Sequence, residues 1–238
     1  MKSKMYIVTG ASSGIGEDLT KSLLNEGHKV IGCGLETNSK ISHKNFIYFK
    51  TDVRDSNLLK SSLKTVLEEN NIKSIDGLIT CAGVCGVSEN IYNTTEERFS
   101  ELFNINVMGT YNTIKAALDY LNEGTIITIS SSLATKPVSN CIAYSPAKAA
   151  ICQLTQNLAL ELSPSIRVNC VAPSYIDTPM TRKEPEKDTM RNMLVANYPL
   201  KRIGYVEDTT NAILFLLSKK SSFITGEILR VSGGGHLR

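Results

Sequence analysis

The feature that most constrains the fold of this 238-residue chain is a glycine-rich turn near its N-terminus. An apolar strand pattern at residues 5–9 (MYIVT) leads directly into GASSGIG at residues 10–16, and a helical pattern follows over about residues 15–25. Glycines allow a tight turn and a close approach to a phosphate, and the free N–H groups of the helix start bind phosphate oxygens. Ser12 and Ser13 add hydroxyl donors. This context predicts a dinucleotide-binding strand, turn and helix.

Strand patterns alternate with helical patterns along the rest of the chain. Further strands are predicted at residues 28–36, 45–53, 76–83, 125–130, 166–173 and 227–235, and helices at residues 56–70, 94–121, 144–162 and 206–217. A long loop is predicted over residues 174–198, where a methionine-bearing segment after a strand suits a substrate lid. The fold class expected is α/β: a doubly wound, mainly parallel seven-stranded sheet (Rossmann-like) with helices on both faces, in a single domain over residues 1–238.

Composition narrows the functional classes. With 42% hydrophobic and 21% charged residues and no apolar run near 18 residues long, we expect a soluble protein with no membrane span and no targeting segment. The 26 basic and 23 acidic residues are interspersed, which gives nucleic-acid binding no support. Six cysteines without a secretory signal favour a reducing cytoplasm over a disulfide framework. Three scattered histidines and no C-x-x-C pair predict no metal site.

An acidic residue about 20 positions beyond such a turn binds the adenosine ribose hydroxyls in dinucleotide-binding folds. Glu36 stands twenty residues after Gly16 and is the candidate, the alternative being a solvated loop acid. No Arg or Lys occupies position 13 or positions 34–36 to meet a 2′-phosphate. These residues favour NAD over NADP.

Tyr144 and Lys148 stand four apart in a helical pattern, so their side chains share one face. A tyrosine acts as an acid or base near neutrality only if its pKa falls by about three, or roughly 4 kcal/mol. An ammonium about 4 Å away supplies on the order of 4 kcal/mol at an effective dielectric constant of 20. Ser131 follows an apolar strand and offers a hydroxyl to a substrate oxygen. The alternative is a surface pair without chemistry.

Asn106 lies inside the predicted helix at residues 94–121. Asparagine disfavours a helix interior because its side chain competes for backbone hydrogen bonds. Two interpretations stay open: simple tolerance of a poor helix former, or a local break whose backbone carbonyl holds a water.

Together these motifs resemble those of the short-chain dehydrogenase/reductase family over essentially the whole chain. TGASSGIG at residues 9–16 is similar to the family's TGxxxGxG, and Ser131, Tyr144 and Lys148 match its active-site spacing. Asn106 sits where the family has its fourth catalytic residue. Asp52 and Val53 resemble the adenine-contacting pair, while Ala172, Pro173 and Thr178 resemble the segment that closes over nicotinamide.

The resemblance implies hydride transfer between nicotinamide and a carbon that bears the reacting oxygen. Tyr144 would exchange a proton with that oxygen, Ser131 would orient it, Lys148 would lower the phenol pKa and bind the nicotinamide ribose, and Asn106 would hold a water. The predicted cofactor-binding residues are Gly10, Ser12, Ser13, Gly14, Ile15, Gly16, Glu36, Asp52, Val53, Cys81, Ala82, Gly83, Tyr144, Lys148, Pro173, Ile176 and Thr178.

Three departures from the family pattern stand out. The family's NNAG reads TCAG here, with Cys81 in place of the asparagine that braces the central strands. Its Pro-Gly reads Pro173-Ser174, which bears on the hinge of the following loop, and its VDGG reads VSGG from Val231. NAD-using members generally place the ribose-binding acid at the position of Gly34 or Leu35 rather than Glu36.

The reaction expected is NAD(P)-dependent interconversion of a secondary alcohol and a ketone, and the small-molecule substrate is left open among hydroxysteroids, sugars or polyols, and 3-oxoacyl thioesters. The alternative is a non-catalytic NAD(P)-binding regulator on the same fold. The presence of Ser131, Tyr144, Lys148 and Asn106 argues for the enzyme. By resemblance, the protein is expected to be a homotetramer paired through the helices at residues 106–121 and 144–162.

Overall fold

Seven parallel strands form the centre of the computed structural model, which describes residues 3–86, 89–182 and 187–237. They run in the order β3-β2-β1-β4-β5-β6-β7, and every neighbouring pair is parallel. The strands are β1 (Met5–Thr9), β2 (Lys29–Gly34), β3 (Phe46–Lys50), β4 (Gly77–Thr80), β5 (Gly124–Ile129), β6 (Ile166–Pro173) and β7 (Ile228–Val231). The strand order reverses between β1 and β4, which confirms the predicted doubly wound sheet.

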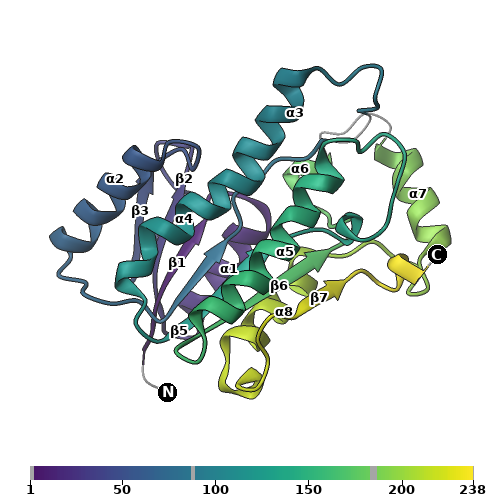
Figure 1. Cartoon of the computed structure of the whole chain (residues 1–238). Helices are drawn as coiled ribbons and strands as arrows, with labels where there is room; N and C mark the ends of the chain where they lie inside the picture. The colour runs from purple at the N-terminus through teal and green to yellow at the C-terminus, as the bar shows by residue number, and fades with distance from the viewer. Residues whose placement is uncertain (1–2, 87–88, 183–186, 238) are drawn as a thin grey trace.

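Helices cover both faces of this sheet (Figure 1). They are α1 (Gly14–Asn25), α2 (Ser56–Glu69), α3 (Glu96–Phe103), α4 (Gly109–Ala117), α5 (Tyr144–Leu162), α6 (Pro179–Arg182), α7 (Lys187–Asn197) and α8 (Val206–Leu217). In the part of the chain that the structure describes, no helix has the length and apolar character needed to cross a bilayer.

Two hydrophobic cores lie on opposite sides of the sheet because successive strand residues point to opposite faces. Ile7, Leu78 and Ile126 face the core that contains buried residues of α2, α4 and α5. Their neighbours Val8 and Ile79 face the core that contains the leucines of α1 and the C-terminal half of α8. Each such fully buried aliphatic side chain contributes roughly 1.5–3 kcal/mol. The central strands are therefore fixed in register, and the residues at their carboxyl ends are fixed with them.

The structure corrects the predicted loop over residues 174–198. Most of that segment is helical, in α6 and α7, and residues 183–186 of the predicted lid lie outside the described residues. The α7 sequence, KDTMRNMLVAN, is rich in good helix formers, and the charged stretch before it obscured that propensity. The strand predicted at residues 45–53 is also shorter, since β3 ends at Lys50 and leaves Asp52 and Val53 in the following turn.

The structure also divides the helix predicted at residues 94–121. Between α3 and α4 the backbone forms a π-helical turn, Asn104–Met108, and a 3₁₀ turn at Leu118–Tyr120 ends the segment. π-Turns inside helices are rare and frequent at functional sites. Asn106 lies in the middle of this turn, so the helix is locally broken there, and the Asn106 carbonyl accepts a hydrogen bond from the Thr110 hydroxyl at 2.8 Å. That this carbonyl holds a water stays a prediction.

Candidate active site

A cavity of about 430 Å³ opens beyond the carboxyl ends of β4, β5 and β6. The predicted site residues that line it are Ile15, Cys81, Gly83, Ser131, Tyr144, Lys148, Pro173, Ile176 and Thr178. Met180, Met193 and Leu194 complete one wall, as their place in the predicted lid suggested. Residues that lie far apart in the sequence thus meet at one edge of the sheet, where doubly wound folds bind their ligands.

The glycine turn packs so tightly that side chains are excluded from it. Gly10 has a φ of +67°, and a Cβ on it would lie 3.0 Å from the backbone nitrogen of Ala82. A Cβ on Gly16 would lie 2.3 Å from the carbonyl oxygen of Gly10. Within the described residues, the side chain of Ser13 does not cap α1, which leaves the first N–H groups of that helix to a ligand. The turn therefore fits a pyrophosphate at the helix N-terminus.

Glu36 reaches back to this turn from beyond the end of β2. The Ser12 hydroxyl donates a hydrogen bond to Glu36 Oε2 at 2.5 Å, and this bond is the main reason that the pKa of Glu36 is lowered. A Cβ on Gly34 would lie 2.8 Å from the Tyr48 hydroxyl, so position 34 is crowded. Glu36 thus places a carboxylate beside the glycine turn, one or two residues later than the position that NAD-using members of the resembled family generally use.

Asp52 and Val53, the predicted adenine-contacting pair, lie in the turn after β3. Arg54 donates to both oxygens of Asp52: Nε lies 3.1 Å from Oδ1, and Nε and Nη2 lie 2.9 and 2.6 Å from Oδ2. These bonds lower the pKa of Asp52. The side chain of Val53 is buried, and its carbonyl accepts a hydrogen bond from Asn112 Nδ2 at 3.0 Å. The Asp52 carboxylate is therefore already engaged by its own neighbour.

Asn106 holds the segment that follows β4. It is fully buried, its Oδ1 accepts from the Val84 N–H at 3.2 Å, and its Nδ2 donates to the carbonyls of Val84 and Leu102 at 3.2 and 3.0 Å. A Cβ on Gly83 would lie 2.7 Å from Asn106 Oδ1 and 3.5 Å from Lys148 Nζ. The asparagine amide thus fixes the backbone directly beside the lysine.

Tyr144 and Lys148 share the first turns of α5, as their spacing predicts. Lys148 is 6% exposed; its Nζ lies 5.7 Å from the centroid of the Tyr144 ring and donates to the Ile129 carbonyl at 3.2 Å. Burial lowers the pKa of Lys148 to about 8. Lys148 is therefore buried, and its charged form is disfavoured because the ammonium is desolvated.

Ser131 is 7% exposed, and its Oγ accepts a hydrogen bond from the Leu133 N–H at 3.2 Å. Among the described residues the Ser131 hydroxyl has no hydrogen-bond acceptor, so its proton is available to a ligand. Its neighbour Ser130 donates to the carbonyl oxygen of Lys148 at 2.7 Å, which ties the end of β5 to α5. Cys81 lines the cavity, and burial raises its pKa to about 12, so this thiol stays protonated.

An ion-pair network that the sequence analysis did not find braces the cavity wall. Arg98 on α3 contacts Glu89 Oε1 at 2.7 Å and the Cys85 carbonyl at 3.2 Å. The backbone N–H of Glu89 donates to the Asn140 carbonyl, and the Glu89 carbonyl accepts from the N–H of Ile142. Ile142 lies two residues before Tyr144. A charge pair between residues nine apart, across a loop, leaves no periodic pattern in the sequence, and for this reason it was not predicted.

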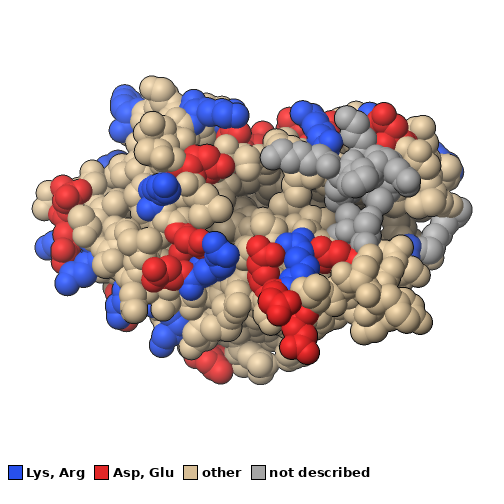
Figure 2. All heavy atoms as spheres, turned by 90° about the horizontal axis from the view of Figure 1, so that it is seen from above, with Lys and Arg blue, Asp and Glu red and all other residues tan. Residues whose placement is uncertain are grey.

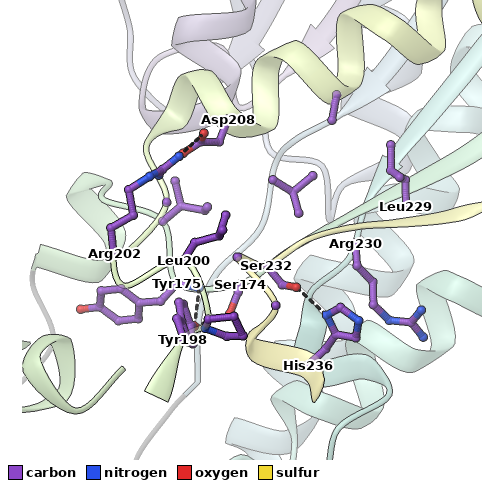
Figure 3. Close-up of a pocket in the computed structure, with 17 residues that line it drawn as sticks. Ser174, Tyr175, Tyr198, Leu200, Arg202, Asp208, Leu229, Arg230, Ser232 and His236 are labelled. Carbon is purple, nitrogen blue, oxygen red and sulfur yellow. Dashed lines mark hydrogen bonds and ion pairs between the residues drawn. The ribbon is translucent and has the colours of Figure 1, made fainter. Parts of the chain in front are cut away.

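The two ends of the 174–198 segment are joined by a hydrogen bond between Ser174 Oγ and Tyr198 Oη (Figure 3). Ser174 is the departure from the Pro-Gly pattern, and the structure assigns its side chain this contact. On the face shown in Figure 2, basic and acidic side chains are interspersed, and neither sign forms a continuous tract among the described residues.

Comparison with known proteins agrees with this geometry. A family model described as enoyl-(acyl carrier protein) reductase matches residues 10–236. A 3-oxoacyl-[acyl-carrier-protein] reductase of Thermotoga maritima is 31% identical over 246 residues, covering 98% of each chain. A 3alpha-hydroxysteroid dehydrogenase of Mediterraneibacter gnavus is 33% identical over 252 residues, covering 98% of this chain and 97% of that protein.

Among solved structures, the aldohexose dehydrogenase of Thermoplasma acidophilum superposes with a TM-score of 0.90 at 30% identity, covering 100% of this chain and 95% of the other. Fold, motif order and relatives therefore agree along the length of the chain. The chain belongs to the short-chain dehydrogenase/reductase family and is an NAD(P)-dependent oxidoreductase of the short-chain type.

Proposed function

We propose that the protein interconverts a secondary alcohol and a ketone in the 430 Å³ cavity, with Tyr144 as the general acid and base. The observation that carries this proposal is the convergence of Ser131, Tyr144 and Lys148 on one cavity beside the Asn106 clamp. When bound, the nicotinamide supplies or accepts the hydride. The chain's own residues place the substrate oxygen and move its proton.

In the reducing direction, Tyr144 donates its phenolic proton to the oxygen that gains negative charge. Ser131 donates a second hydrogen bond to the same oxygen. The Lys148 ammonium stabilises the phenolate that Tyr144 leaves behind, and because its pKa is about 8, a lysine proton is also available to restore the phenol. Gly10, Ser12, Ser13, Gly14, Ile15 and Gly16 would hold the pyrophosphate, and Cys81, Ala82, Gly83, Pro173, Ile176 and Thr178 would border the nicotinamide.

The substrate proposed is an apolar ketone, of the ring or acyl-chain kind, rather than a sugar. The relatives named above act on 3-oxoacyl groups, hydroxysteroids and aldohexoses, so the family alone leaves the choice open. Polar side chains such as Ser139 and Asn140 line part of the cavity, but most of the surface that faces it is apolar, with Val138, Met180 and Leu194 in its wall. Such a surface favours the apolar part of a ring or an acyl chain.

NAD is the proposed cofactor because the Glu36 carboxylate lies beside the glycine turn and would repel a 2′-phosphate. We further propose a cytoplasmic homotetramer that pairs through α4 and α5, where Tyr111 and Leu160 are exposed. Six cysteines, none of them in a disulfide within the described residues, suit a reducing compartment. A monomeric mass by light scattering would rule out the tetramer.

The experiment for the reaction is oxidation of NADH and NADPH by the purified protein with ketosteroids, 3-oxoacyl thioesters and keto-sugars. Tyr144→Phe should lower turnover by roughly 10²–10⁴-fold, because the general acid is lost, while cofactor affinity is retained. Tyr92→Phe, at a tyrosine that is 97% exposed in the loop before α3, is the matched control. A Tyr144→Phe variant with near-normal turnover would remove Tyr144 from the mechanism.

A further inference from the structure

A second cavity, of about 490 Å³, lies between the start of α8, β7 and the C-terminal turn, and Figure 3 shows the residues that line it. Four residues line both cavities: Ser174, Tyr175, Ile176 and Tyr198. The two spaces are therefore separated by a wall one side chain thick. Tyr198 is the buried aromatic residue of that wall, with 5% of its surface exposed.

Tyr198 is fixed at both ends of its side chain. Its hydroxyl forms the hydrogen bond with Ser174 Oγ and accepts a long one, 3.4 Å, from the Tyr175 N–H. Its ring lies against the glycine turn at the C-terminus, since a Cβ on Gly235 would lie 2.5 Å from Tyr198 Cε1. Packing on one side and hydrogen bonding on the other hold the ring across the gap between the cavities.

The second cavity is lined by apolar side chains together with charged ones that already have hydrogen-bond partners. The charged groups around it have partners within the chain: Arg202 donates to Asp208 at 2.6 and 2.8 Å, and Arg230 Nη2 donates to Thr135 Oγ1 at 3.3 Å. His236 Nδ1 and Ser232 Oγ lie 2.7 Å apart. What remains facing the space includes Leu200, Ala212, Leu229 and Val231. Such a space suits the apolar part of a larger ketone.

Resting on the function proposed above, we infer that Tyr198 is a specificity-determining residue that closes the catalytic cavity toward this second, apolar cavity. The ring limits the enzyme to ketones whose apolar part fits within the first cavity. Removal of the ring joins the two spaces, and a longer substrate then buries its additional methylenes there. Two additional buried methylenes correspond to roughly tenfold tighter transition-state binding.

The test uses Tyr198→Ala and the milder Tyr198→Leu, with NADH-dependent reduction of a series of 2-alkanones of increasing chain length. The ratio of kcat/KM for the longest to the shortest reactive alkanone should rise at least tenfold in Tyr198→Ala and by less in Tyr198→Leu. Tyr198→Phe keeps the ring and loses only the hydroxyl, so its ratio should equal that of the wild type. Thermal melting and cofactor binding confirm that each variant is folded.

A second substitution that refills the second cavity tests whether Tyr198 acts as a wall between the two cavities or has a merely structural role. Ala212 lines the second cavity and not the first, so Ala212→Phe added to Tyr198→Ala should return the ratio toward the wild-type value. An unchanged ratio in folded Tyr198→Ala and Tyr198→Leu, or one that Ala212→Phe does not reverse, would overturn the inference. If the wild type reduces no ketone at all, the proposed function fails instead, and the two failures are therefore distinguishable.

Discussion

Replacing Lys148 by methionine should make the protein more stable near neutral pH while it removes activity. Lys148 is 6% exposed, and burial lowers its pKa from 10.5 to about 8. At pH 7 the folded chain therefore holds a desolvated ammonium, which destabilises it by about 3 kcal/mol relative to a neutral side chain. Methionine removes this term but leaves the Ile129 carbonyl without its donor, at a cost of about 1–2 kcal/mol. The expected net gain is about 1–2 kcal/mol.

The sign of the pH dependence follows from proton binding. Between pH 8 and 10.5 the unfolded chain keeps the Lys148 proton and the folded chain loses it, so wild-type stability from this group rises with pH. Lys148→Met has no such term. The stability difference between variant and wild type should therefore shrink by roughly 2–3 kcal/mol between pH 7 and pH 10, and change sign.

The assay is urea unfolding of the cofactor-free proteins at pH 7 and pH 10, with the difference between variant and wild type as the readout. Using the difference cancels groups common to both, such as Tyr6 and Cys33, whose pKa values burial raises to about 12. Lys115→Met, at an exposed lysine of α4, should shift stability by less than about 0.5 kcal/mol. A Lys148→Met variant that is less stable at pH 7, or whose difference is the same at both pH values, refutes the reasoning.

Two further predictions concern the cofactor and the cavity wall. Glu36→Arg should raise the ratio of kcat/KM with NADPH to kcat/KM with NADH at least tenfold, because a guanidinium replaces a carboxylate beside Ser12. Glu69→Arg makes the same charge change on α2 and should leave this ratio unchanged. An unchanged ratio in Glu36→Arg would assign Glu36 to the solvated loop. Arg98→Met should raise KM for the ketone several-fold with cofactor affinity unchanged and stability lowered by about 1 kcal/mol, because Cys85 and Glu89 lose their common donor. Glu101→Gln removes only the outer partner of Arg98, so an equal KM increase in both variants would contradict the bracing role.

Much of the fold was predictable because local signals agreed with the tertiary structure. The strand at residues 5–9, the glycine turn and the helix at residues 206–217 match the elements formed. The loop prediction for residues 187–197 was wrong, because these residues fold as a helix after a charged stretch. At Asn106 the sequence left two interpretations open, and the π-turn shows that the helix is locally broken there. Both outcomes depend on packing against the rest of the chain, which periodicity does not contain.

By itself the sequence determined the order of the elements, the glycine turn and the shared face of Tyr144 and Lys148, because these depend on residues within one turn or one strand of each other. Only the tertiary structure decided the state of Lys148, since its lowered pKa arises from burial by several elements. The tertiary structure also decided the ion pair between Arg98 and Glu89 and the contact between Ser174 and Tyr198, which are 24 residues apart. Such contacts depend on where the fold places two distant backbones, and that placement is a property of the whole sheet.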